Sequence, residues 1–121
     1  MDERRWMDRG ALLALAGLIG AVGVASAAAA SHGESRNLGS IAMIGLAHGP
    51  VLVALALVGQ GRLLGVAGWL IAAGTVLFVG DLGVREWLGH GLFPGAAPIG
   101  GMGMILGWLA LIPASFKLVM R

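Results

Sequence analysis

Four long stretches of apolar residues, separated by short polar segments, dominate this sequence. They cover about residues 10–30, 39–59, 63–80 and 99–119. Each is close to the ~20 mainly apolar residues that an α-helix needs to cross a bilayer. None shows the alternation of apolar and polar residues that marks a membrane-spanning strand. The sequence therefore predicts an all-α fold, a four-helix transmembrane bundle built as one integral membrane domain over residues 1–121.

The composition agrees with a protein that is surrounded by lipid. Of the 121 residues, 58% are hydrophobic and 12% are charged, which is about half of the charged share of an average soluble domain. The 22 glycines also suit membrane helices, because small residues let neighbouring helices approach closely. The sequence contains no cysteine, which excludes disulfides and cysteine metal sites within it.

The basic residues are scattered, which argues against a nucleic-acid-binding surface. They fall unequally on the two sides of the predicted bundle, and the cytoplasmic side of a membrane protein carries the excess of Lys and Arg. We therefore expect both termini in the cytoplasm, residues 81–98 as the longest extracytoplasmic loop, and a multi-pass protein of the cell inner (plasma) membrane. The richer side holds Arg4, Arg5, Arg9, Arg62, Lys117 and Arg121, and the other side holds Arg36 and Arg85.

The first apolar stretch has a second interpretation. An Arg-rich start, an apolar run and the small residues 25–29 together also describe a secretory signal peptide, whose cleavage would leave three spans. The apolar stretch is about 20 residues long, beyond the usual 7–15 of a signal peptide. This length favours a retained helix, and whether the helix is ever cleaved stays open at this point.

His48 is the first candidate for a functional residue. It lies nine residues past Gly39, so at 1.5 Å per residue it is about 13.5 Å below the outer edge, near the middle of the membrane. An ionisable residue there suggests proton transfer, or binding of a metal, haem or quinone. The alternative is a neutral histidine packed inside the bundle, which is favoured because Pro50 leaves a backbone carbonyl without its helical partner.

Trp108 lies nine residues into the last span. That span runs in the same direction as the span containing His48, so the two residues should have similar depths. A tryptophan at the middle of a membrane needs a partner for its indole N–H. We therefore predict that Trp108 faces the bundle interior close to His48.

The longest polar segment, residues 81–98, contains three charged residues, one histidine and two prolines. If the helix predicted over 63–80 continues past the membrane, Asp81 and Arg85 are four residues apart on one helical face. Side chains at this spacing are neighbours and form ion pairs. The segment thus contains either a long loop or a helical extension with an internal ion pair.

Other chemistry has less support. His32 and His90 should lie at the outer surface, where Glu34, Asp81 or Glu86 would have to complete a metal site, but no dense ligand motif is present. A G-x-S-x-G motif and a phosphate-binding loop are also absent. We expect no catalytic residue, no metal site and no cofactor, and hence no enzyme.

The chain resembles a known family in several motifs. Residues 77–82, followed by Ala97-Pro98-Ile99-Gly100-Gly101 and Leu106-Gly107-Trp108, are similar to the domain-of-unknown-function 423 family, which includes YgdD-like and transmembrane protein 256-like small membrane proteins. The family's Gly-Ala-His-Gly resembles Ala30-Ser31-His32-Gly33, and its Tyr-x-x-x-His-Ala resembles the stretch ending at Ala47-His48-Gly49. The tyrosine is missing here, and Ser31 replaces an alanine.

The resemblance implies a four-helix inner-membrane protein and carries no established activity. The positions that match the family's motifs are His32, Gly33, Asp81, Pro98, Gly100, Gly101 and Gly107.

Three functions remain open. The favoured one is a non-enzymatic component that packs against other transmembrane helices, either as a homo-oligomer or as an accessory subunit of a larger complex. The expected partners are therefore the lipid bilayer and such helices. The second is a small transport or channel protein with His48 on a proton, ion or solute path. The third is an electron-transfer subunit that binds haem or quinone through His48, with no other cofactor-binding residue identified.

Overall fold

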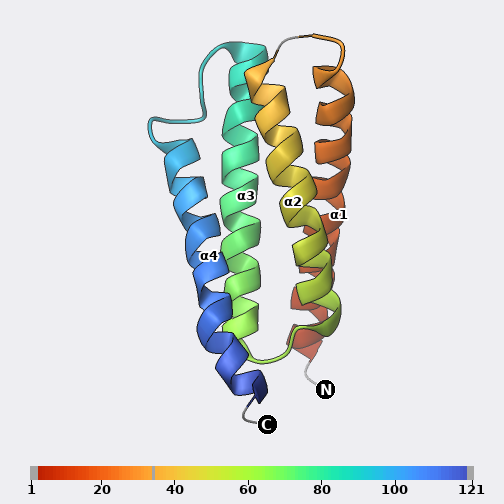
Figure 1. The fold of residues 1–121 in the computed structure, drawn as a ribbon, viewed down its shortest axis with the longest axis vertical. Helices are drawn as coiled ribbons and strands as arrows, with labels where there is room; N and C mark the ends of the chain where they lie inside the picture. The colour runs from red at the N-terminus through yellow and green to blue at the C-terminus, as the bar shows by residue number, and fades with distance from the viewer. Residues whose placement is uncertain (1–2, 34, 120–121) are drawn as a thin grey trace.

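The computed structural model describes residues 3–33 and 35–119, with side chains from residue 8 onward. It contains four helices in chain order: α1 (Glu3–Ala30), α2 (Arg36–Val58), α3 (Arg62–Leu88) and α4 (Ala96–Val119). The helices run side by side along the long axis, and the two ends of the chain lie at the same end of the bundle (Figure 1). The predicted all-α four-helix fold is confirmed.

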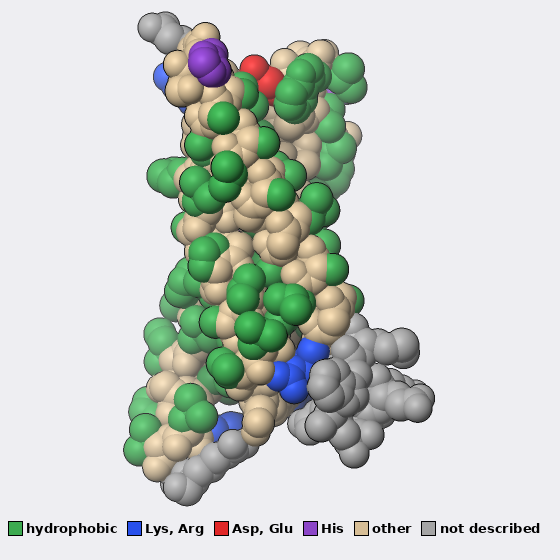
Figure 2. Space-filling view, turned by 90° about the vertical axis from the view of Figure 1, so that its right-hand side faces the viewer, with side chains coloured by type: hydrophobic (Ala, Val, Ile, Leu, Met, Phe, Trp, Pro, Cys, Tyr) green, Lys and Arg blue, Asp and Glu red, His purple; other side chains and the backbone are tan. Residues whose placement is uncertain are grey.

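All four helices are long and apolar enough to cross a membrane. Large hydrophobic side chains lie exposed on every helix, Leu18, Leu57, Val76 and Ile112 among them. Figure 2 shows apolar side chains over the length of one face, with histidine, acidic and basic side chains near one end and further basic side chains near the other. Exposed apolar surface of this extent is typical of a protein whose sides contact lipid or other proteins.

At the end of the bundle opposite the chain termini, three of the described helices, α2, α3 and α4, are longer than the sequence indicated. Helix α3 continues past residue 80 to Leu88, and α4 begins at Ala96, so the connecting loop covers residues 89–95 instead of 81–98. Gly89 ends α3 in a left-handed conformation, with φ of 77°, and its N–H donates to the carbonyl of Arg85. Pro98 falls in the first turn of α4, where a proline's missing N–H breaks no helical hydrogen bond.

The four helices form two tightly packed hairpins, α1–α2 and α3–α4, which meet where α2 packs against α3. Glycines set the close approach within each hairpin. A Cβ on Gly49 would lie 3.2 Å from the backbone of Gly20 on α1. On the other hairpin, a Cβ on Gly100 would lie 2.7 Å from the carbonyl oxygen of Gly74. Larger residues at these positions would push the helices apart.

The hydrophobic core lies between α1, α2 and α3. Its buried side chains include Leu12, Ile19, Leu52 and Ile71. Within the described residues, the backbone of α4 approaches α3 and neither of the other two helices, and Figure 1 shows α4 and α1 on opposite sides of the bundle. Any link between α4 and α2 therefore depends on long side chains that reach across α3.

Candidate functional site

His48 is buried on α2, with 7% of its surface exposed. Its Nδ1 atom lies 2.8 Å from the carbonyl oxygen of Ile44, one turn earlier in the same helix. A carbonyl oxygen can only accept a hydrogen bond, so Nδ1 must carry the proton of the imidazole ring. The other ring nitrogen, Nε2, is directed toward α4.

Trp108 on α4 donates its Nε1–H to Nε2 of His48 over 3.0 Å. The two rings meet edge to face, with centroids 5.8 Å apart and planes at 78°. The predicted contact is therefore confirmed. The orientation of Trp108 is only partly as predicted, because 42% of its surface is exposed on the side of the bundle. The indole N–H points inward while part of the ring faces the lipid.

This geometry assigns the chemical state of His48. Because the indole N–H can only donate, Nε2 must be the unprotonated acceptor nitrogen. His48 is therefore a neutral imidazole whose two nitrogens both have partners. Metal or haem ligation, or proton uptake at Nε2, would first have to break the bond to Trp108. That bond joins α2 to α4, so such chemistry would also loosen the bundle.

Two further uncharged polar side chains are buried among the described residues of the spans. Thr75 on α3 is fully buried and donates its hydroxyl to the carbonyl of Ile71 over 2.6 Å. Ser26 on α1 is 7% exposed. In the part of the chain that the structure describes, no hydrogen-bonded chain joins either residue to His48.

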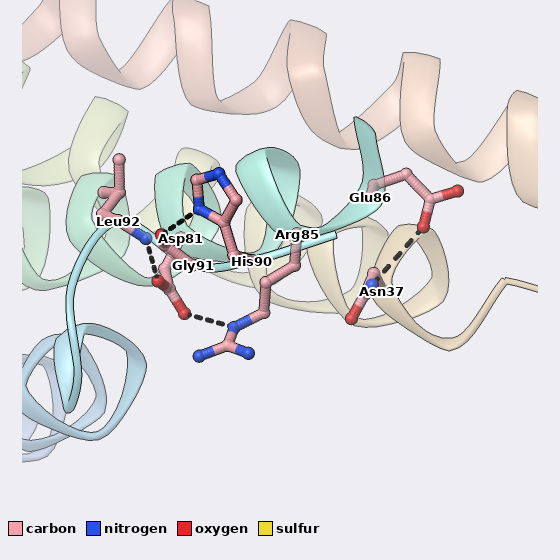
Figure 3. Close-up of polar contacts among 7 residues, drawn as sticks. All are labelled: Asn37, Asp81, Arg85, Glu86, His90, Gly91 and Leu92. Atoms are coloured by element: carbon pink, nitrogen blue, oxygen red, sulfur yellow. Dashed lines mark hydrogen bonds and ion pairs between the residues drawn. The ribbon is translucent and has the colours of Figure 1, made fainter. Parts of the chain in front are cut away.

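The end of the bundle opposite the chain termini is organised by Asp81, whose surface is fully buried. Its Oδ2 accepts the Nε–H of Arg85 over 3.0 Å, so the pairing predicted for a continued helix is confirmed. Its Oδ1 accepts the backbone N–H of Leu92 over 2.8 Å and thereby fixes the loop after α3 (Figure 3). A Cβ at Gly91 would collide with Asp81 and with the Arg85 guanidinium, which explains the glycine there.

Glu86 ties the end of α3 to the start of α2. It accepts the hydroxyl of Ser35 over 2.7 Å. It also accepts, more weakly, the amide N–H of Asn37 over 3.4 Å, a contact drawn in Figure 3. The same Ser35 hydroxyl accepts the N–H of Leu38 and caps α2. This contact was not predicted from the sequence. A serine just before an apolar run is a recognisable helix cap, but its partner on α3 became predictable only with the extension to Leu88.

The described residues considered as metal ligands do not lie together. No group of three or more His, Cys, Asp or Glu residues in the described chain could hold a metal ion. His32 and His90 are exposed, and Nδ1 of His90 bonds the neighbouring carbonyl of Gly91. Asp81 and Glu86 are engaged in the contacts above, and Glu34 lies outside the described residues.

The positions that match the family motifs are spread over the molecule. Gly100 and Gly107 face α3, where a Cβ on Gly107 would lie 2.9 Å from the carbonyl of Ala67. Gly101 has no neighbour within 4 Å. His32 and Gly33 lie exposed after α1, Pro98 is exposed on α4, and Asp81 holds the loop. Gly100 and Gly107 thus serve the packing of α4 on α3, and Asp81 serves the shape of the loop.

The chain matches a known family over most of its length and two known proteins over less than half of it. The family described as "Protein of unknown function (DUF423)" matches residues 16–101. A "UPF0382 membrane protein" of Staphylococcus aureus (strain bovine RF122 / ET3-1) is 43% identical over 51 residues, which is 42% of each chain. Its counterpart in Staphylococcus haemolyticus (strain JCSC1435) is 42% identical over 53 residues, 44% of this chain and 43% of the relative.

These local matches span less than half of each relative's length. No solved structure matches the chain. The family match covers well over half of the sequence, and it includes His48, Asp81, Pro98, Gly100 and Gly101. With four spanning helices and relatives that are named membrane proteins, the chain is a multi-pass membrane protein, and it belongs to the DUF423 family of proteins of unknown function.

Proposed function

We propose that this protein is a non-enzymatic component of the inner (plasma) membrane that works by packing against other transmembrane helices. It does so in a homo-oligomer or as an accessory subunit of a larger membrane complex. One observation carries the proposal. The ionisable side chain deepest in the described spans, His48, has both ring nitrogens committed to contacts within the protein.

The two alternatives would each need His48 to be available. A proton or ion path needs polar groups in series, whereas Thr75 bonds within its own helix and is not joined to His48. A haem or quinone site needs Nε2 of His48, which is the atom that holds Trp108. The structural use of this nitrogen supports packing over transport or electron transfer.

The proposed orientation places both termini in the cytoplasm. The two ends of the chain lie at the same end of the bundle (Figure 1), which is the end that holds Arg62 and Lys117. The excess of Lys and Arg on this side supports a cytoplasmic location.

The experiment is extraction of the tagged full chain from its native membrane in a mild detergent, followed by native mass spectrometry. We expect a species well above the 12.2 kDa of one chain. A multiple of this mass would identify a homo-oligomer, and a constant additional protein would identify a larger complex. A single unaccompanied chain at native expression level would contradict the proposal.

A second measurement separates packing from transport. The purified chain in liposomes is expected to conduct no more protons or ions than protein-free liposomes. The matched variant His48→Leu is expected to behave in the same way. Conductance that the wild type shows and His48→Leu loses would overturn the packing role and favour a path through His48.

A further inference from the structure

A cavity of about 170 Å³ opens at the end of the bundle where the termini lie. It lies between the turn that joins α2 to α3, the first turn of α3 and the last turns of α4. Its lining includes the polar side chains of Gln60, Arg62 and Lys117. The other side chains that line it form an aliphatic wall of Leu63, Leu64, Ala114 and Leu118.

The two cations in this cavity come from different helices and have no carboxylate partner among the described residues. Among the described residues, Arg85 and Asp81 form a salt bridge, and it lies at the opposite end of the bundle from the cavity. Arg9, which lies at the same end as the cavity, donates to the carbonyls of Ala56 and Leu57 at the end of α2. Within the described chain, Arg62 and Lys117 therefore bring two positive charges to one cavity without a compensating anion.

The backbone adds to this positive field. Gly61 is the N-cap of α3, and it has no side chain that could accept a hydrogen bond from the first turn. The backbone N–H groups at the start of α3 carry a partial positive charge and favour an anion. The start of α3 thus adds partial positive charge to that of Arg62 and Lys117, which supply most of the charge of the site.

We propose that this cavity binds the phosphate of an anionic phospholipid headgroup. Arg62 and Lys117 supply the charge, and the aliphatic wall lies where the spans end, so it can accept the first carbons of the lipid. A soluble phosphate would use the cations but gain nothing from Leu63, Ala114 and Leu118. Basic pockets between helices on the cytoplasmic side bind lipid headgroups for the same physical reasons.

The test is lipid binding by the delipidated full chain in detergent, measured by native mass spectrometry. The probes are phosphatidylglycerol, which is anionic, phosphatidylcholine, which has no net charge, and inorganic phosphate. We expect the chain to bind one molecule of phosphatidylglycerol tightly, and to bind phosphatidylcholine more weakly. Each of Arg62→Gln and Lys117→Gln should weaken that binding on the order of fivefold, since one basic residue near the headgroups contributes about 1 kcal/mol.

The matched control is Arg36→Gln, which removes an exposed positive charge from the opposite end of the bundle. It should leave the binding of phosphatidylglycerol unchanged. Arg62 and Lys117 are themselves exposed, so their variants should keep the helical content of the wild type, as circular dichroism would show. If both variants lose helix, the salt dependence of lipid binding by the wild type replaces them as the test. Raised ionic strength should then weaken the binding of phosphatidylglycerol and leave the binding of phosphatidylcholine unaffected.

Three results would overturn the proposal. Equal binding of the two lipids would remove the role of charge. An equal effect of Arg36→Gln would show that net charge matters and that the cavity does not. Inorganic phosphate that displaces phosphatidylglycerol at comparable concentration would show that the aliphatic wall contributes nothing and that the ligand is a soluble phosphate. The lipid site and the packing role are independent, because neither set of measurements uses the outcome of the other.

Discussion

A histidine near the middle of a membrane span is a default candidate for chemistry, and its hydrogen bonds decide whether that role is available. Nδ1 of His48 bonds the carbonyl of Ile44, and Nε2 bonds the indole of Trp108. The second bond is also the link from α2 to α4, whose backbones stay apart in the described residues. At the scale of the residue, His48 is a connector between the two hairpins.

Trp108→Phe tests this connection. The substitution keeps an aromatic ring but removes the donor to His48, so it leaves Nε2 buried without a partner. We expect a loss of about 1 kcal/mol in the free energy of unfolding, measured by detergent denaturation in mixed micelles. The control is Trp69→Phe on α3, whose indole has no hydrogen-bond partner among the described residues. An equal loss in both variants would assign the effect to ring size alone.

The depth of a residue in a predicted span was enough to find this pair. His48 and Trp108 each lie nine residues into spans of the same direction, and a membrane fixes where those spans begin. The partly lipid-facing ring of Trp108 could not be found in this way, because depth says nothing about rotation around the helix axis. Rotation is set by the contact of α4 with α3.

At the scale of the helix, neighbouring glycines on α4 have opposite surroundings. A Cβ on Gly100 would lie 2.7 Å from both the carbonyl oxygen of Gly74 and the backbone nitrogen of Phe78, while Gly101 has no neighbour within 4 Å. The sequence pattern marks both glycines equally. Only the structure shows which of the two sets the distance between α3 and α4.

Gly100→Ala and Gly101→Ala form a matched pair for this contact. We expect Gly100→Ala to destabilise the protein by about 1–3 kcal/mol, because backbone atoms of α3 would have to move. Gly101→Ala should be neutral or stabilising by up to about 1 kcal/mol, since alanine favours a helix more than glycine does. Thermal unfolding in one detergent would compare them, and equal effects would contradict the close contact.

The end of α3 shows a limit of prediction from hydropathy. Charged residues after Gly80 indicated the start of a loop, yet the helix continues to Leu88. The buried carboxylate of Asp81 accepts from Arg85 one turn later and from Leu92 in the loop. Local hydrogen bonding offsets the polarity of this segment, and hydropathy alone does not register it. The i,i+4 spacing did predict the ion pair once a helix was assumed.

Asp81→Ala tests the role of this carboxylate in the loop. The backbone N–H of Leu92 would lose its acceptor. We therefore expect hydrogen exchange to become faster at Leu92 and in the loop 89–95 that contains it. Glu86→Ala, at the same end of α3, removes contacts to Ser35 and Asn37 instead. It should leave the exchange of Leu92 unchanged. Unchanged exchange in Asp81→Ala would show that the loop is held by other contacts.

At the scale of the whole molecule, the sequence predicted four spans and the structure agrees, because each span needs only length and apolar composition. The pairing into α1–α2 and α3–α4 hairpins was less predictable, since Gly-x-x-x-Gly spacings are frequent in a chain with 22 glycines. The angles at which the helices cross determine which of these glycines come into contact with a neighbouring helix. The short α2–α3 turn at Gly59–Gly61 specified only that those two helices are neighbours.

The orientation of the bundle can be tested directly, because the sequence contains no native cysteine. Single variants Ser31→Cys and Gln60→Cys place exposed thiols at opposite ends. In intact cells, a membrane-impermeant maleimide should label Ser31→Cys and should label Gln60→Cys only after the membrane is opened. The reverse pattern would place both termini outside and contradict the positive-inside argument.

The protonation pattern of His48 is the most direct test of the view that this residue is structural. Solid-state NMR of the protein with ¹⁵N-labelled histidine in lipid bilayers at neutral pH would report it. We expect the signal of His48 to show the neutral Nδ1–H tautomer. Its Nε2 resonance should shift in the variant Trp108→Phe. Three results for His48 would contradict the structural role: a charged imidazolium, an Nε2–H tautomer, or an Nε2 resonance that stays unchanged in Trp108→Phe. Any of them would make His48 a candidate for a chemical role again.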